Sequence, residues 1–228
     1  TGTREGLAAA FGAKPEQFRV VVGDLGGGFG MKTGLANEDA VVCYAARKLG
    51  RPVKWRADRS EEFLAAHMGR DQYYEAELAL DREGRILALR TRVTADFGAV
   101  PVGSTAIIPL VLGPKVQTTV YHVPTVDFHV RGVLTNTMAT GAYRGAGRPE
   151  ATYVLERTMD ALAAELGIDP IELRRKNFIG EFPHTMASGL WGTKRCPMQT
   201  YEIRVLNDDL STRAIVAQQY LNDGAATR

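Results

Sequence analysis

The stretch V-V-V-G-D-L-G-G-G-F-G-M-K, Val20–Lys32, leads three β-branched residues into an Asp and then into a loop made almost entirely of glycine. Without a Cβ atom, glycine adopts positive φ angles and lets a ligand come close to backbone N–H groups. Successive N–H groups in a loop that leads into a helix form a site for an anion, such as a phosphate or an oxo group. The alternative interpretation is a tight strand-to-helix turn that binds no ligand.

Two common phosphate-binding motifs do not fit this loop. A P-loop requires Gly-Lys-Ser/Thr as adjacent residues, whereas here Met31 separates Gly30 from Lys32. The dinucleotide fingerprint requires G-x-G-x-x-G at the start of a helix. Counted from Gly26 and Gly28, its third glycine would fall on Met31. The stretch is therefore a glycine loop of another kind.

Length and charge limit the classes of protein to consider. The chain has 228 residues and a formal net charge of +2, which suits one large domain or two small ones and gives no electrostatic footprint for nucleic acid or an anionic membrane. No apolar run approaches the roughly 20 residues of a membrane span. Cys43 and Cys196 are too few for a disulfide framework, so we expect a cytoplasmic protein. The chain begins without Met, which suggests a processed product or a fragment.

Residue periodicity predicts a mixed α+β fold. Apolar residues at helical spacing predict helices over 3–11, 35–49, 149–166 and 170–177, the second with an inward apolar stripe that includes Cys43 as a buried structural thiol. Extended patterns predict strands over 18–22, 53–56, 73–80, 86–97 and 126–135. Asp81–Gly84, D-R-E-G, predicts a hairpin turn between the third and fourth of these strands. The small, apolar and irregular segment 98–113 suits the lining of a cavity or a subunit contact.

A second glycine loop lies in Ala139–Glu150, A-T-G-A-Y-R-G-A-G-R-P-E. Its glycines bracket Tyr143 and Arg144, and Pro149 has the fixed φ suited to the first position of a helix. Arg144 is a planar donor suited to anionic oxygens, although Arg144 and Arg148 could instead pair with surface carboxylates. Two glycine loops that each open a helix favour a shared anionic ligand.

The four histidines give no metal-ligand pattern. None stands at i, i+4 from another on a helix, and no carboxylate accompanies them at metal spacing. We interpret all four as surface residues or hydrogen-bonded core residues and predict no protein ligand to a metal.

Four motifs in order resemble one enzyme family. They are G-G-G-F-G-M-K (Gly26–Lys32), G-R-P-V-K (Gly50–Lys54), A-Y-R-G-A-G-R-P-E (Ala142–Glu150) and P-I-E-L-R-R-K-N (Pro170–Asn177). Together they resemble the large, molybdenum-binding subunit of the molybdenum hydroxylases, which include xanthine dehydrogenase, aldehyde oxidoreductase and aerobic carbon monoxide dehydrogenase. The resemblance predicts a molybdopterin-binding region over 1–182, with a subdomain break near 98–125. It does not extend to the tail, 183–228, which we expect to be out of frame or poorly ordered.

The resemblance also implies a cofactor site and its chemistry. The cofactor would be molybdenum–molybdopterin in its cytosine dinucleotide form, with iron–sulfur clusters and FAD on partner subunits of a hetero-oligomer. Arg144 would be the catalytic residue, near the oxygen ligands of the metal. The reaction would be oxidation of a small aldehyde or N-heteroaromatic substrate with water as the oxygen source. The residues implied to bind the cofactor are Gly26, Gly27, Gly28, Phe29, Gly30, Tyr143, Arg144, Gly145 and Ala146.

Departures from the family pattern narrow this expectation. The catalytic Glu of the family lies in a glycine-rich motif toward the C-terminus of the complete subunit, and no such motif follows Asn177. Gly145 stands where certain carbon monoxide dehydrogenases have a cysteine, and Thr33 and Ala146 replace the Glu and Phe of purine oxidisers, which disfavours both substrates. The fragment alone should be inactive. A non-catalytic scaffold or assembly subunit of the same fold and a generic nucleotide-phosphate binder are the alternatives.

Overall fold

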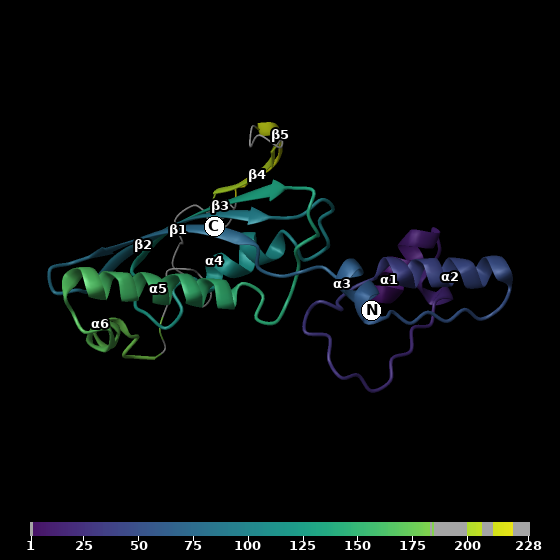
Figure 1. The fold of residues 1–228 in the computed structure, drawn as a ribbon, viewed down its shortest axis with the longest axis horizontal. Coiled ribbons are helices and arrows are strands. Elements are labelled where there is room, and N and C mark those ends of the chain that lie inside the picture. Colours follow the sequence, from purple (N-terminus) through teal and green to yellow (C-terminus); the bar gives the residue numbers. More distant parts are fainter. Residues whose placement is uncertain (1, 183, 185–199, 207–211, 221–228) are drawn as a thin grey trace, which may run out of the picture. The chain divides into compact units, whose positions relative to one another are not determined.

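The computed structural model describes residues 2–182, 184, 200–206 and 212–220. It divides into two compact units (Figure 1). Unit 1 comprises Thr1–Met68 together with Ala142–Arg144, and unit 2 comprises Gly69–Gly141 and Gly145–Arg228. The subdomain break expected from the sequence near 98–125 therefore falls inside unit 2. Most of the tail expected to be atypical lies outside the described residues.

Unit 1 is built from short helices joined by long loops. Its elements are α1 (Gly2–Phe11), the 3-10 turn η1 (Pro15–Gln17), α2 (Asn37–Leu49) and α3 (Arg59–Ala65). Gly50 ends α2 in the left-handed conformation, with φ 63°, which glycine adopts without a Cβ penalty. Asp58 caps α3, because its carboxylate accepts a hydrogen bond from the backbone N–H of Glu61 at 2.8 Å. The predicted helices are confirmed here, with α2 shorter at its start.

The two strands predicted for unit 1 are wrong. Residues 18–22 and 53–56 are not assigned as strand, and the side chains of Val21 and Val22 are 74% and 63% exposed. A β-branched run becomes a strand only when a neighbouring strand pairs with it and a packed surface covers it. The described residues offer these two segments neither.

The apolar stripe of α2 is also exposed rather than buried. No residue of α2 is buried, and Val41 and Tyr44 remain 64% and 57% exposed. Cys43 is a free thiol of intermediate burial, so the expectation of a fully buried thiol is corrected.

Unit 2 is organised around one mixed sheet. Its strands lie in the order β1 (Gln72–Leu80), β2 (Ile86–Asp96), β3 (Thr125–Leu134), β4 (Thr200–Leu206) and β5 (Thr212–Tyr220). The outer pairs β1–β2 and β4–β5 are antiparallel, whereas β2–β3 and β3–β4 are parallel. The mixed arrangement of helices and strands confirms the predicted α+β class.

Local sequence explains the antiparallel pair β1–β2. The carboxylate of Asp81 accepts hydrogen bonds from the backbone N–H groups of Glu83 and Arg85, at 3.0 and 2.8 Å. Gly84 takes the positive φ of 81° that the turn needs. The hairpin is therefore closed by side-chain hydrogen bonds within its own turn, as its sequence predicted.

The helices of unit 2 are the π-helical turn η2 (Ile108–Leu112), α4 (Gly113–Val116), α5 (Arg148–Leu166) and α6 (Pro170–Asn177). Helix α5 packs against β1, and α4 and α6 contact α5 (Figure 1). Gly167 ends α5 with φ 64°, and Asp169 caps α6 by accepting from two backbone N–H groups. Among the described residues, no helix has the length and apolar character that crossing a membrane requires.

The core of unit 2 lies between the sheet and α5. Leu89 and Val130 from the strands and Leu155 and Met159 from α5 have no solvent exposure. Buried Asn177 ties α6 to the hairpin, since its Oδ1 accepts from Ile86 N at 2.8 Å and its Nδ2 donates to the carbonyl of Gly84 at 2.9 Å. The helices and strands that carry this core are those whose patterns were clearest in the sequence.

An ion-pair cluster joins α5 to α6 at the edge of the core. Arg174 Nε lies 2.8 Å from a Glu156 oxygen, and Arg174 Nη2 lies 2.7 Å from Asp160 Oδ1. Burial lowers the pKa of Arg174, but the hydrogen bonds to both carboxylates outweigh burial and raise it. The Tyr121 hydroxyl donates to Glu156 at 2.7 Å. Burial, followed by this hydrogen bond, raises the pKa of Tyr121.

Candidate functional site

The two glycine loops predicted from the sequence meet in unit 1. The backbone N–H of Arg144 donates to the carbonyl of Phe29 at 2.8 Å, and the Arg144 guanidinium lies 4.7 Å from the centre of the Phe29 ring. A cation above an aromatic face at this distance is attracted by the ring quadrupole. One residue of each loop therefore holds the other through both backbone and side chain.

The first loop needs its glycines so that the second loop can come close to it. Gly30 has φ 86°, and a Cβ at this position would lie 3.2 Å from the carbonyl oxygen of Ala142. Gly27 has φ 126°, and a Cβ there would lie 3.0 Å from the Phe29 ring. Phe29 itself takes the left-handed φ of 50°, which costs energy in a residue with a side chain. The local conformation is thus built around close backbone contacts that a larger residue would disturb.

The N–H groups of this loop are available as donors. Among the described residues, none provides a hydrogen-bond acceptor for the backbone N–H of Gly26, Gly27, Gly28 or Phe29. The side chain of Phe29 is 50% exposed, so the loop lies at the surface of unit 1. Consecutive free N–H groups in a loop with positive-φ residues form a concavity for anionic oxygens.

Lys32 closes the loop but directs its charge elsewhere. Its Nζ lies 3.0 Å from Glu62 Oε1 on α3, with side-chain exposures of 59% and 32%. The backbone N–H of Lys32 donates to the carbonyl of Gly28 at 3.1 Å. The residue therefore shapes the loop through its backbone and directs its ammonium group toward α3.

The rest of the second loop belongs to unit 2. Gly145, Ala146 and Gly147 all take positive φ angles, of 98°, 43° and 93°. A Cβ on Gly145 would lie 2.7 Å from Cδ of Pro149, and a Cβ on Gly147 would lie 3.0 Å from the backbone nitrogen of Gly113. Pro149 lies in the first turn of α5, as the sequence predicted.

The segment that leads into the second loop, residues 135–140, is called the stem here. It is held by a network of side-chain hydrogen bonds that the sequence did not predict. Thr135 Oγ1 donates to Asp96 Oδ1 at 2.8 Å, and Thr137 Oγ1 donates to Asp96 Oδ2 at 3.0 Å. Thr140 Oγ1 donates to the backbone carbonyl of Asp96 at 2.6 Å, and Thr105 Oγ1 donates to the carbonyl of Thr140. The end of β2 therefore fixes the segment that enters Ala142–Arg144.

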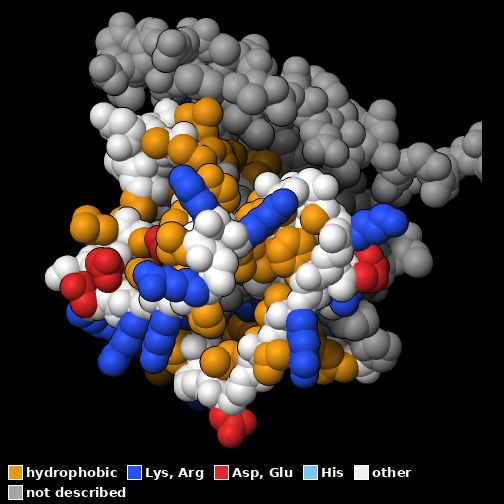
Figure 2. Space-filling model, turned by 90° about the vertical axis from the view of Figure 1, so that its right-hand side faces the viewer, with side chains coloured by type: hydrophobic (Ala, Val, Ile, Leu, Met, Phe, Trp, Pro, Cys, Tyr) orange, Lys and Arg blue, Asp and Glu red, His pale blue; other side chains and the backbone are white. Residues whose placement is uncertain are grey.

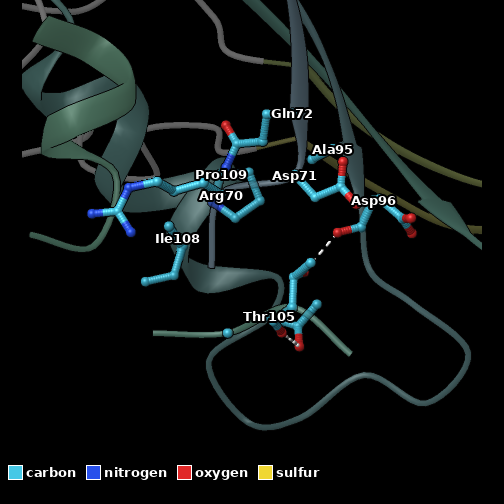
Figure 3. A pocket seen from close by; sticks show the side chains of 10 residues that line it. Arg70, Asp71, Gln72, Ala95, Asp96, Thr105, Ile108 and Pro109 are labelled. Carbon is cyan, nitrogen blue, oxygen red and sulfur yellow. Dashed lines mark hydrogen bonds between the residues drawn. The ribbon is translucent and has the colours of Figure 1, made fainter. Parts of the chain in front are cut away.

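A small polar pocket lies beside this stem (Figure 3). Its lining side chains come from the start of β1, the end of β2 and the segment around Thr105 and Ile108. Thr140 and Gly141, which immediately precede the Arg144 segment, complete the lining. The segment 98–113 was expected to line a cavity or a subunit contact, and Thr105, Ile108 and Pro109 of this segment line the pocket.

The donor set defines what the site can bind. It combines surface N–H groups of a glycine loop with a planar guanidinium, both suited to phosphate or oxo groups. Among the described residues, no group of three or more His, Cys, Asp or Glu side chains stands close enough to hold a metal ion.

Comparison with known proteins places this arrangement in a family. The sequence profile of the molybdopterin cofactor-binding domain matches residues 1–178. The chain belongs to this family.

Several relatives of this molybdopterin cofactor-binding domain are known. The carbon monoxide dehydrogenase large chain of Hydrogenophaga pseudoflava is 39% identical over 183 residues, which cover 78% of this chain and 23% of the relative. Nicotine 6-hydroxylase large subunit of Paenarthrobacter nicotinovorans is 34% identical over 81% of this chain and 23% of its own. The crystal structure of quinoline 2-oxidoreductase from Pseudomonas putida 86 matches 82% of this chain and 24% of its own, with TM-score 0.76 and 38% identity. The chain therefore spans about a quarter of the length of these relatives.

Sequence reasoning could find only part of the site. The glycines and Arg144 stand out in the sequence because their grouping is unusual. Nothing in the sequence pointed to Asp96 as the common acceptor for the threonines after β3. His67, whose Nε2 lies 3.2 Å from the carbonyl oxygen of Ala142, carried no sequence signal, because its partner is distant along the chain.

Proposed function

We propose that the chain forms part of the large subunit of a molybdenum hydroxylase, in which the two glycine loops hold the molybdenum–molybdopterin cofactor. The observation that carries this proposal is the hydrogen bond from Arg144 N to Phe29 O at 2.8 Å. It joins the two loops at a single surface of free N–H donors and a guanidinium. The family to which the chain belongs supports the identity of the ligand.

Each loop has its own task in this proposal. The N–H groups of Gly26, Gly27, Gly28 and Phe29 bind anionic groups of the cofactor, and Gly30 allows the second loop to approach. The cofactor, when bound, supplies the oxidation–reduction chemistry. Arg144 contributes a fixed positive charge beside the cofactor, held in orientation by the ring of Phe29. The proposal also includes Tyr143, Gly145 and Ala146 among the residues that bind the cofactor.

The proposed substrate is an aldehyde or an N-heteroaromatic compound, oxidised with water as the oxygen source. Relatives named for nicotine and quinoline, both N-heteroaromatic, support this class. Carbon monoxide is disfavoured at Gly145, because the φ of 98° and the 2.7 Å approach of Pro149 Cδ leave no room for a cysteine side chain in this loop conformation. Thr33 and Ala146 disfavour purines.

The proposal extends to partners that carry electrons away from the site. Relatives include subunit gamma of the 6-hydroxypseudooxynicotine dehydrogenase complex, which is 38% identical over 68% of this chain, so assembly with other subunits is supported. We propose iron–sulfur and FAD-binding partners in a cytoplasmic hetero-oligomer, and a cytosine dinucleotide on the pterin. The catalytic glutamate would lie outside this chain.

The test uses the complete large subunit with its partners. Arg144→Ala should lower kcat about 100-fold or more, as removal of one oriented donor does elsewhere, while molybdenum per subunit stays near the wild-type value. Arg144→Lys keeps the charge and should retain more activity. Arg148→Ala, which removes a neighbouring arginine of the same loop, is the matched control and should change kcat less than threefold.

Three results would contradict the proposal. Unchanged kcat in Arg144→Ala would remove Arg144 from the site, and absence of molybdenum from the wild-type complex would favour a scaffold subunit. Protection of the cofactor-free chain against thermal unfolding by Mg-ATP would favour a nucleotide-phosphate binder.

A further inference from the structure

Helix α3 and the segment after it contact both glycine loops. On the first loop, Glu62 of α3 pairs with Lys32 at 3.0 Å. On the second loop, His67 Nε2 lies 3.2 Å from the carbonyl oxygen of Ala142. The start of α3 is fixed by a reciprocal cap, because Asp58 and Glu61 each accept a hydrogen bond from the backbone N–H of the other at 2.8 Å. Helix α3 and the segment that follows it therefore contact both loops of the candidate site, one through Glu62 and the other through His67.

The two contacts differ in what they can hold in place. Lys32 and Glu62 are long side chains, one of them 59% exposed, and such exposed pairs stabilise little. His67 is partly buried and has a short side chain with only two rotatable bonds. It contacts a backbone carbonyl, so it restrains the main chain itself. His67 is therefore the stronger restraint on loop geometry.

The carbonyl of Ala142 lies at a crowded point of the site. Because a carbonyl can only accept, His67 Nε2 must carry a proton, and both the neutral Nε2–H tautomer and the imidazolium can donate. The same carbonyl is 3.2 Å from where a Cβ of Gly30 would lie. The next peptide unit along the chain contains the N–H of Arg144, which donates to the carbonyl of Phe29. The orientation of the Ala142 carbonyl therefore affects the direction in which the backbone N–H of Arg144 points toward the carbonyl of Phe29.

We propose that His67 is a positioning residue, which holds the Ala142 carbonyl and thereby orients Arg144 and the first glycine loop for the ligand. His67 acts through the loop backbone and does not itself contact the ligand. The significance of the loop it positions rests on the proposed function, whereas the positioning itself is a property of the chain without cofactor.

The first experiment measures loop order in the cofactor-free chain by hydrogen–deuterium exchange. His67→Phe keeps an aromatic ring but removes the donor, and it should speed exchange in peptides covering 142–146 and 28–32 about fivefold, the effect expected for one lost hydrogen bond. His67→Gln places an amide N–H near the position of Nε2 and should restore slow exchange. His122→Phe, at an exposed position in unit 2, is the matched control and should leave these peptides unchanged.

Peptides from β2 and β3 report whether a variant has lost its fold. If they exchange as in the wild type while 142–146 is unaffected by His67→Phe, the proposal is wrong. If His67→Phe disturbs β2 and β3 as well, His67→Gln decides, since equal disturbance in both variants would show a packing role and contradict the proposal.

The second experiment uses the complete subunit and separates this proposal from the proposed function. His67→Phe should lower kcat about tenfold with KM and substrate range unchanged, and the spectroscopic signature of the metal should shift. His67→Gln should restore both. A wild-type subunit without molybdenum would overturn the proposed function and leave the exchange result standing. Normal kcat in His67→Phe with faster exchange of 142–146 would overturn the positioning role in catalysis.

Discussion

Units 1 and 2 differ sharply in how they are stabilised. Unit 2 buries a continuous core between its sheet and α5, with Leu89, Leu155 and Met159 fully excluded from solvent. Among the described residues of unit 1, only Leu7 and Ala8 are buried. Hydrophobic side chains instead remain at the molecular surface between projecting Lys and Arg side chains (Figure 2). Yet the glycine loop that begins the candidate site belongs to unit 1.

The candidate site and the stable core therefore depend on different kinds of contact. Unit 2 has the packing that stabilises a fold, whereas the first loop depends on backbone hydrogen bonds, glycine conformations and a few side-chain contacts. Loops of this kind are held by specific local contacts and belong to the less stable part of a structure. Substitutions should therefore act differently in the two units.

The largest expected effect is in the core of unit 2. Leu155→Ala should lower the free energy of unfolding by about 3 kcal/mol, because it removes a fully buried side chain and leaves a cavity. Val21→Ala, at a side chain that is 74% exposed in unit 1, is the matched control and should change it by less than about 0.5 kcal/mol. Urea unfolding followed by circular dichroism measures both. Equal losses would erase the distinction between the units.

A smaller effect is expected at Tyr121, with a dependence on pH. Tyr121→Phe removes the hydrogen bond to Glu156 and should cost about 1 kcal/mol at pH 7. Because burial and this bond raise the pKa of Tyr121 in the folded state, the wild-type tyrosine contributes full stability below its unfolded pKa of about 10 and loses that contribution as pH rises further. The difference in unfolding free energy between wild type and variant should therefore shrink above pH 10. A difference that grew with pH would contradict this assignment.

The smallest effect is expected at the ion pair of unit 1. Lys32→Ala and Glu62→Ala should each change stability by less than about 1 kcal/mol, because the pair is largely exposed and screened by salt. A double-mutant cycle at low and high salt measures the coupling between the two side chains. Coupling above about 2 kcal/mol that persisted in high salt would mean that the first loop is more rigidly held than its exposure implies.

What the sequence could predict follows the same division. The hairpin around Asp81 and the helix after Pro149 were predicted because their signals are local, in turn residues, capping residues and periodic apolar positions. The segments 18–22 and 53–56 were predicted as strands and are not, since a strand also requires a partner that no local pattern reveals. The prediction that the apolar stripe of α2 is buried was wrong for the same reason, because burial requires a packing partner that no local pattern reveals.

The candidate site was predictable to the extent that unusual residues mark it. The two glycine-rich stretches and the arginine that precedes Gly145 stand out in the sequence, and Phe29 and Arg144 do meet. Asp96 and His67 could not be found, because each acts on a loop far along the chain through an ordinary polar side chain. Long-range contacts between common residue types leave no local trace.

The parallel pairing of β2 with β3 has a consequence for the order of folding. The hairpin β1–β2 closes through a short turn, but parallel strands cannot be joined that way and need a long crossover, here residues 97–124 with η2 and α4. Because loop closure must precede the gain from such contacts, we expect the hairpin to form early and the centre of the sheet to form late. Substitutions in the Asp81 turn should then slow refolding, whereas Val130→Ala in β3 should chiefly accelerate unfolding. Slower refolding in Val130→Ala would reverse that order.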